Sequence, residues 1–296
     1  MKLIKPSFEI WNQPAGLEGV YKQIERVGRV CYKSEDKITE DSAKPFVDRM
    51  IKSGHGAMLE HGTVYLAIPG TTYAPEAVNI YHNNSYSKVN ECNEFIFTDK
   101  YGDKVAAWCV TTNLRVLVEN DCLEDLEFLC EPTEFHEKRI TVHFVCDRGV
   151  SHEFVRHRVF SFAQESTRYC NYSKDKFGNE ITFIKPCFLD DSKLALYGPY
   201  HTVIRDKSPE SIFIASLNNA EKDYIDLIDL GWKPQEARAV LPNALKTELV
   251  VTGFASDWNH FFDLRAKGTT GAPHPQAKEL AEPLMKEFIA RKYINN

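Results

Sequence analysis

The spacing of apolar residues along the chain predicts a mixture of helices and strands. Apolar side chains recur every three or four positions over residues 17–31 and 42–53, which is the period of a helix with one buried face. Residues 63–68 (TVYLAI) and 113–118 (NLRVLV) have the composition of strands. Residues 138–147 (KRITVHFVCD) alternate apolar and polar positions, so they predict a half-buried strand.

Residues that favour helix ends predict a series of helices in the second half of the chain. Ser208-Pro209 is a strong start signal, and Gly231 marks the end of that helix about six turns later. The other expected helices are one capped by Ser151, one that begins at Pro234, one capped by Ser256 or Asp257, and one over residues 275–293 with a kink or break at Pro283. Because helices and strands do not alternate regularly, the fold class is α+β, with an antiparallel or mixed sheet flanked by helices.

Residues 70–104 interrupt this pattern. They are rich in Gly, Asn, Ser and Tyr, which predicts a loop with room for a hairpin around Asp99–Asp103. The chain contains no repeat or clear linker, so we expect a single domain over residues 1–296.

Composition and charge narrow the function classes. The chain has a formal net charge of −6, which argues against non-specific binding to nucleic acid. It has no apolar run of eighteen residues and no secretory signal, so neither a membrane span nor export is expected. Its 8 cysteines include no Cys-x-x-Cys pair, which fits reduced thiols in the cytoplasm.

Positive charge is nevertheless concentrated in one stretch, RHRVFSFAQESTRY, over residues 156–169. Arg156, Arg158 and Arg168 carry planar cations suited to phosphate or carboxylate groups, and only Glu165 lies nearby in the sequence to neutralise them. A single arginine is more often paired with a carboxylate of the same protein. For this cluster we expect a bound anion.

Two other motifs do not meet the requirements of the sites that they suggest. His152 and His157 flank a glutamate but stand five positions apart, so they do not share the helix face that a zinc protease needs. The segment that begins Gly54-His55-Gly56 follows a helix instead of a strand, which excludes a dinucleotide-binding fingerprint. No metal site is expected.

The arginine-rich stretch resembles the signature of flavin-dependent thymidylate synthases, in which Arg-His-Arg is followed seven residues later by Ser. Three other segments resemble motifs of the same family and stand in the same order along the chain. The four segments are Gly54–His61, Arg156–Ser166, Glu236–Pro242 and Phe261–Arg265. On these residues the chain is identified as similar to that family.

The resemblance implies an enzyme that transfers a methylene group from methylenetetrahydrofolate to dUMP and reduces it with a hydride from FAD, so that dTMP is formed. NADPH would reduce the flavin again. A homotetramer whose active sites combine residues of several subunits is also implied, with no membrane or nucleic-acid partner.

Residue roles follow by position from the resemblance. The residues implied to contact FAD are His55, Ala57, Glu60, Arg156, His157, Arg158, Gln164, Phe254, Ala255, Ser256 and His260. Those implied to surround dUMP are Glu153, Arg156, Gln164, Glu165, Ser166, Thr167, Arg168 and Arg238, with Arg168 and Arg238 on its phosphate. Arg265 is the implied catalytic residue, because it matches an arginine that binds the uracil and favours ionisation of its N3–H.

The chain departs from the family pattern at several positions. Ala163-Gln164 stands where Asn-Glu is usual, Ala57 replaces a hydroxyl residue, and residues 70–138 look like an insertion. Because this pair is altered, an enzyme of the same fold that acts on another pyrimidine nucleotide remains an alternative. A second alternative is a non-enzymatic protein that uses the arginine cluster to bind a nucleotide or RNA.

Overall fold

The computed structural model of the chain describes residues 1–70, 76–98, 101–190 and 208–295. Its central element is a four-stranded antiparallel sheet in the order β2–β6–β9–β7. The strands are β2 (Ser7–Trp11), β6 (Arg139–Asp147), β9 (Lys246–Phe254) and β7 (Ser161–Gln164). A second antiparallel sheet has the order β3–β5–β4 and comprises β3 (Thr63–Pro69), β5 (Lys104–Asn113) and β4 (Lys88–Thr98). A short parallel pair joins β1 (Lys2–Ile4) to β8 (Thr182–Ile184).

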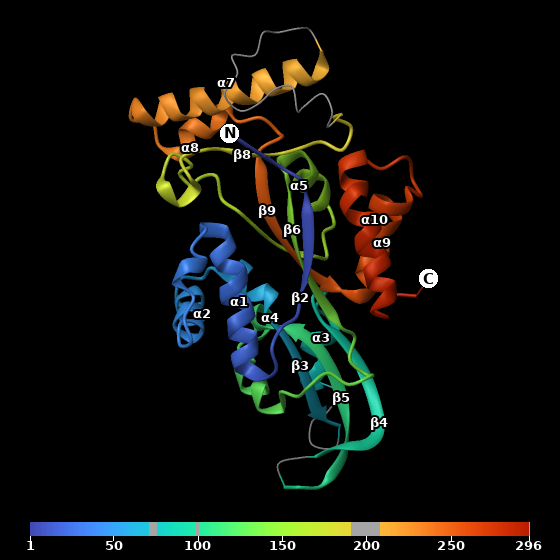
Figure 1. Cartoon of the computed structure of the whole chain (residues 1–296). Helices are drawn as coiled ribbons and strands as arrows, with labels where there is room; N and C mark the ends of the chain where they lie inside the picture. Colours follow the sequence, from blue (N-terminus) through green and yellow to red (C-terminus); the bar gives the residue numbers. More distant parts are fainter. Residues whose placement is uncertain (71–75, 99–100, 191–207, 296) are drawn as a thin grey trace.

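Helices cover both faces of the central sheet. Leu249 and Val251 of β9 pack in one apolar cluster with α9 (Ala255–Phe262) and α10 (Pro275–Ala290). Val250, which points to the opposite face, packs in a second cluster with α1 (Gly16–Tyr32). Figure 1 shows α9 and α10 beside β6 and β9, with α1 nearer the β3–β5–β4 sheet. The predicted α+β class, with antiparallel and mixed pairing flanked by helices, is confirmed.

The remaining helices lie around these layers. The α-helices are α2 (Ala43–Lys52), α3 (Glu76–His82), α4 (Leu114–Glu119), α5 (Arg148–Phe154), α7 (Pro209–Asp229) and α8 (Pro234–Ala237). Short 3-10 helices cover Glu35–Lys37, Gly56–His61, Leu123–Phe128, Asp175–Phe177 and Arg238–Val240, and a π-helix covers Asp263–Lys267. Helix α7 packs on a third apolar cluster that includes Phe183 and Leu245, at the end of the molecule where Figure 1 places β8.

Several helix predictions are confirmed. Helices α1 and α2 match the predicted periodic segments, and the Ser208 hydroxyl caps α7 by accepting a hydrogen bond from the Ser211 amide at 3.1 Å. Helix α10 begins at Pro275 as expected. It runs through Pro283 without a break and ends at Ala290, three residues earlier than predicted.

Other local predictions are wrong. Residues 114–119 form helix α4 where a strand was expected, because the Asn113 side chain accepts a hydrogen bond from the Val116 amide and caps the helix. Residues 70–104 hold α3 and all of β4 instead of a loop. The hairpin expected around Asp99–Asp103 is confirmed by the antiparallel pairing of β4 with β5, although residues 99–100 lie outside the described residues. Strand β6 is buried along most of its length, because both faces of its sheet are covered.

Two expected helix starts also differ. Asp147, and not Ser151, caps α5 by accepting from the Val150 amide at 2.8 Å, while the Ser151 hydroxyl donates to the Arg148 carbonyl. Neither Ser256 nor Asp257 caps α9, which begins one residue earlier at Ala255. The start predicted at Pro234, in contrast, is confirmed, and that helix tightens into a 3-10 turn at Arg238.

Candidate active site

The predicted catalytic residue, Arg265, is fixed by two other predicted site residues. Its Nε donates to His157 Nε2 at 3.2 Å, its Nη2 donates to the Glu153 carbonyl at 2.7 Å, and its Nη1 pairs with the Glu153 carboxylate. A guanidinium has five N–H donors. These three bonds therefore leave one N–H on each of Nη1 and Nη2 to meet a ligand.

His157 lies at the centre of this cluster and is held in its neutral form. Its side chain is buried against Phe160 and Phe261, and its ring centroid lies 5.7 Å from that of His260. Burial, followed by the charges of Arg265 and His260, lowers the pKa of His157 to about 4. Because Nε2 accepts from Arg265, the ring proton is on Nδ1.

The flanking residues Arg156 and Arg158 are exposed. Within the described part of the chain neither arginine has a carboxylate within the 4.0 Å of an ion pair. Two permanent cations with no carboxylate partner among the described residues, on either side of a buried neutral histidine, favour an anionic ligand at this turn.

A second group gathers the predicted phosphate-binding residues. Arg238 Nη1 donates to the Thr167 hydroxyl at 3.1 Å, and Arg168 Nε donates to the Gln235 side chain at 3.1 Å. The Ser166 hydroxyl accepts from the Arg168 amide at 3.3 Å. The end of β7 and helix α8, which are far apart in sequence, therefore bring two exposed guanidinium groups to one corner.

The two residues that depart from the family pattern lie in the sheet. Ala163 is buried, and the Gln164 amide donates to the hydroxyls of Ser151 at 2.8 Å and Thr247 at 3.2 Å. Gln164 thereby ties β7 to α5 and β9. An amide with these two bonds retains its carbonyl oxygen as an acceptor for a ligand.

The side chain of Glu165 does not face a ligand. It is 2% exposed, and its carboxylate accepts from Lys246 Nζ at 2.8 Å and from the Tyr172 hydroxyl at 3.1 Å. This glutamate therefore anchors the Ser166–Arg168 turn to β9. A contact between Glu165 and dUMP would have to use its backbone.

Glu248 on β9 is the centre of a half-buried charge network next to that anchor. Its carboxylate contacts Lys246 at 2.5 Å, Lys33 at 2.8 Å and His143 Nε2 at 2.9 Å. Burial opposes ionisation, but the hydrogen bond from His143 and the two lysine charges outweigh it and hold the pKa of Glu248 well below its usual range. The network joins α1, β6 and β9 beneath the predicted dUMP segment.

Glu248→Gln is expected to lower the free energy of unfolding by about 3 kcal/mol at pH 7, because it leaves two lysines partly buried without their carboxylate. A carboxylate whose pKa is depressed in the folded state contributes its stability above its ordinary pKa, and loses it as the pH falls below that value. The difference between wild type and variant should therefore shrink below about pH 4.5. Urea unfolding of wild type and variant at pH 7 and pH 3.5 measures this difference in the free energy of unfolding. A difference that is the same at both pH values would contradict the lowered pKa of Glu248.

A third group contains the predicted flavin contacts from the first motif. His55 is exposed, Ala57 is half-buried, and Glu60 Oε1 pairs with Arg115 Nη1 at 2.5 Å. Sequence reasoning missed Arg115, because residues 113–118 were read as a strand. The Arg115–Glu119 pair at helical spacing is the signal that could have indicated an exposed helix face.

The start of α9 holds three other predicted flavin contacts. The Phe254 ring is buried, so this residue can offer a ligand only its backbone. Ala255 is half-buried and Ser256 is exposed, and the Ser256 amide donates to Glu137 at 3.1 Å. Only Ser256 of these three presents a free side chain at the surface.

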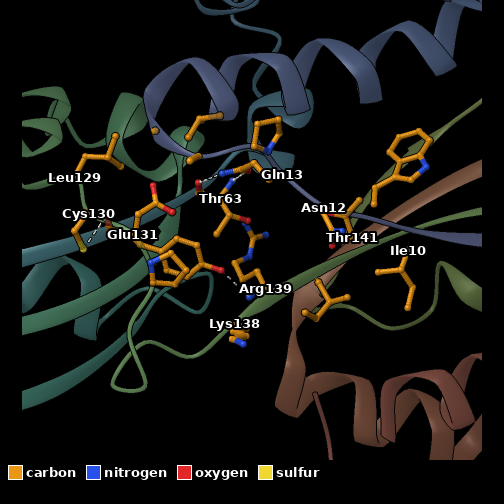
Figure 2. Close-up of a pocket in the computed structure, with 18 of the residues that line it drawn as sticks. Ile10, Asn12, Gln13, Thr63, Leu129, Cys130, Glu131, Lys138, Arg139 and Thr141 are labelled. Carbon is orange, nitrogen blue, oxygen red and sulfur yellow. Dashed lines mark hydrogen bonds between the residues drawn. The ribbon is translucent and has the colours of Figure 1, made fainter. Parts of the chain in front are cut away.

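Figure 2 shows a cavity of about 210 Å³ around Arg139, next to Gln13 and Thr63. None of the predicted site residues lines it. Arg139 is buried, and burial lowers its pKa to about 10. Its Nη1 donates to the Glu60 carbonyl at 3.0 Å and its Nη2 to the Ser161 hydroxyl at 3.3 Å. Arg139 therefore ties the Glu60 turn to β7, a role for which a single arginine before a strand gives no sequence signal.

The chemistry of these groups fits a flavin dinucleotide. Arg156 and Arg158 offer exposed cations for a diphosphate, and Ser256 offers a hydroxyl. A cavity of about 520 Å³ opens beside Val159 and Asp257, the residues that follow Arg158 and Ser256 in the chain. The predicted FAD contacts thus offer charge and hydrogen-bonding groups, and the cavity is lined by the chain neighbours of two of them.

Metal-dependent and membrane-spanning functions would each require a distinct structural feature. Within residues 1–70, 76–98, 101–190 and 208–295, no three His, Cys, Asp or Glu side chains are grouped so that they could hold a metal ion. The same residues include no helix with the length and apolar character needed to span a bilayer.

Comparison with known proteins decides the family. The model of the family described as "Thymidylate synthase complementing protein" (Thy1) matches residues 130–291, which is more than half of the chain. The chain belongs to this family. The matched region contains three of the four motif segments, including Arg156–Ser166 and Arg265. The Thy1 assignment confirms the resemblance inferred from those motifs.

Curated relatives share the name "Flavin-dependent thymidylate synthase". The relative from Geobacter sulfurreducens is 30% identical over 118 residues, which cover 40% of this chain and 43% of the relative. The one from Pyrococcus furiosus is 32% identical over 149 residues, covering 50% and 53%. In these alignments the Thy1 chain spans about half the length of its relatives. The relative from Corynebacterium aurimucosum is 23% identical over 279 residues, covering 93% and 78%.

Solved structures give a more distant likeness. The UMP/dUMP methylase PolB from Streptomyces cacaoi, bound with 5-Br dUMP, aligns over 98% of this chain and 93% of its own with 16% identity and a TM-score of 0.42. Similarity at this level establishes neither a shared fold nor a shared ligand.

Proposed function

We propose that this Thy1 protein is a flavin-dependent thymidylate synthase that converts dUMP to dTMP, with methylenetetrahydrofolate as carbon donor, FAD as cofactor and NADPH as reductant. The observation that carries the proposal is the Arg265–His157–Glu153 cluster. It joins the last motif segment to the central arginine motif in the folded chain. The family and the names of its curated relatives support the same reaction.

The nucleotide would be bound first by its phosphate. Arg168 and Arg238 stand at one corner and are oriented by Gln235 and Thr167. Guanidinium groups form paired, charge-assisted hydrogen bonds with phosphate oxygens. The Ser166–Arg168 turn would therefore fix the nucleotide at the end of β7.

Arg265 would then act on the uracil. Its two remaining N–H groups can donate to an N3 anion and an adjacent carbonyl oxygen. Because Glu153 and His157 hold the guanidinium in place, it stabilises negative charge on the ring without first having to reorganise. Ionisation at N3 makes the ring carbon that accepts the methylene more nucleophilic.

The geometry supports a reaction without an enzyme nucleophile. The Ser166 hydroxyl accepts from the Arg168 amide and has no hydrogen-bonded histidine among the described residues to activate it. Cys187 is exposed, but desolvation raises its pKa, which reduces the fraction of reactive thiolate.

FAD, when bound, would supply the hydride. Arg156 and Arg158 would hold its diphosphate, and the neutral His157 would contact it without adding charge. Arg139 would support this site indirectly, because it holds the Glu60 carbonyl and Ser161 in place. The chain's own contribution is thus to bind, orient and exclude water around the reacting groups.

We also propose a single cytoplasmic domain that assembles as a homotetramer. All 8 cysteines are free, which suits a reducing compartment. The family resemblance implies active sites completed by neighbouring subunits. Light scattering should give a mass four times the 33.9 kDa of the chain, and a monomer would contradict the assembly.

A second candidate is an enzyme of the same fold that acts on another pyrimidine nucleotide. It is favoured by Gln164, because a neutral amide held by Ser151 and Thr247 replaces the usual carboxylate at the expected junction of nucleotide and flavin. Turnover of a panel of pyrimidine nucleotides by the FAD-loaded protein would distinguish it from a dUMP enzyme.

The first experiment concerns the cofactor. We expect protein reconstituted with FAD to show flavin absorbance bands, which bleach when NADPH is added without oxygen. A protein that cannot be loaded with FAD would contradict the proposed function and favour a binding module.

A further inference from the structure

We propose that residues 82–88, which run from the end of α3 to the start of β4 within the 70–138 region, form one wall of the FAD site, and that Lys88 binds the FAD diphosphate. This inference rests on the proposed function and assigns a role to a segment that has no counterpart in the family motifs. It adds a cofactor-binding residue to those implied by the resemblance.

The main observation is the cavity of about 520 Å³ between this segment and the chain neighbours of two predicted flavin-contact residues. One side is lined by Tyr81, His82, Asn83, Asn84, Ser85, Ser87, Lys88 and Val89. The other side is lined by Val159 and Asp257, which directly follow Arg158 and Ser256 in the chain. A ligand that contacts Arg158 and Ser256 is therefore within reach of residues 82–88.

A second cavity extends the same wall. It has a volume of about 230 Å³, shares Asn84 with the first cavity, and is lined also by Glu60 and Arg115. The turn at Asn84 thus borders both the Glu60 turn and the Arg158–Val159 turn. These are the two predicted flavin-binding motifs that the sequence separates by almost a hundred residues.

The segment is held firmly by the rest of the fold. The Ser87 and Thr112 hydroxyls are hydrogen-bonded at 2.8 Å, which fastens the start of β4 to β5. Within the turn, the Asn84 side chain accepts from the Tyr86 amide at 2.8 Å, and the Asn84 carbonyl accepts from the Ser87 amide at 3.0 Å. A wall formed before the ligand arrives costs little ordering entropy on binding.

Lys88 gives this wall its charge. It is half-buried, with its Nζ 5.5 Å from the centroid of the Phe254 ring, and no carboxylate within the described ranges lies within the 4.0 Å of an ion pair. Asp257 on the facing side is the cavity's single carboxylate. A cation suits phosphate oxygens, and a carboxylate accepts from sugar hydroxyls. The ribityl diphosphate chain of FAD carries both kinds of group, whereas the phosphate of dUMP already has the Arg168–Arg238 corner.

Flavin affinity tests the role of Lys88 separately from catalysis. Protein stripped of flavin is titrated with FAD and with riboflavin, and binding is followed by quenching of flavin fluorescence. Lys88→Met should raise the Kd for FAD about tenfold, which corresponds to about 1.4 kcal/mol, and leave the Kd for riboflavin unchanged. Lys88→Arg should recover most of the FAD affinity, and Lys44→Met, on the exposed face of α2, is the matched control.

The outcomes separate this inference from the proposed function. Wild-type protein that binds no flavin overturns the proposed function itself. Wild-type protein that binds FAD with the same Kd as Lys88→Met overturns the role of Lys88. An equal loss of FAD and riboflavin affinity in Lys88→Met, with an unchanged melting temperature, shows a packing effect and overturns the phosphate contact.

Discussion

Arg265→Ala is expected to reduce turnover of dUMP by about a hundred- to a thousandfold. The guanidinium is fixed by His157 Nε2 and by the carbonyl and carboxylate of Glu153, so it faces the ligand with two N–H groups already in place. Alanine removes the charge that stabilises the uracil anion and leaves Glu153 as an unpaired carboxylate at the same point. Steady-state rates of dTMP formation measure the effect.

Arg265 lies within the π-helix Asp263–Lys267 and its side chain is only 14% exposed, so the melting temperature of Arg265→Ala is measured together with its turnover. Lys267→Ala is a matched control, since Lys267 lies in the same π-helix and pairs only locally with Asp263. Turnover close to that of wild type in Arg265→Ala, with an unchanged melting temperature, would refute the catalytic role.

Arg238→Met is expected to raise the KM for dUMP by about ten- to a hundredfold while kcat changes little. A charge-assisted hydrogen bond to phosphate contributes about 1.5–3 kcal/mol, and the phosphate is remote from the reacting carbon. An interaction made equally in the ground state and the transition state appears in KM and not in kcat. Initial rates at varied dUMP concentration separate the two constants.

Deoxyuridine, which lacks the phosphate, provides the control for Arg238. Wild type and Arg238→Met should use it equally poorly, because the lost contact is absent in both. Lys222→Met, an exposed lysine on α7, should behave like wild type with both substrates. A kcat effect in Arg238→Met at saturating dUMP would place this arginine near the chemistry instead of on the phosphate.

The sequence predicted the central elements because their signals are local and strong. Helix α1 has an apolar stripe of helical period, and Ser208-Pro209 marks the start of α7. The proximity of Arg168 to Arg238, and of Arg265 to His157, was implied only by the family resemblance. Periodicity and composition describe only neighbouring residues, whereas the two residues of each pair lie far apart in the sequence and meet only in the folded chain.

The failures have physical reasons. The Asn113 side chain caps α4, so residues 114–119 form a helix although their composition predicts a strand. The Asp147 side chain caps α5, although Ser151 is the expected cap. The 82–88 segment carries turn residues that gave no hint of a wall beside Val159 and Asp257. Arg139 is recognisable only in the folded chain, where its hydrogen bonds reach Glu60 and Ser161.

The most direct test of the account is the conversion of dUMP itself. FAD-loaded protein is incubated with dUMP, methylenetetrahydrofolate and NADPH, and the nucleotides are separated and identified by mass spectrometry. The account predicts dTMP in amounts that exceed the enzyme, and none when methylenetetrahydrofolate or FAD is omitted. Protein that holds FAD and is reduced by NADPH, yet leaves dUMP unchanged, would contradict it.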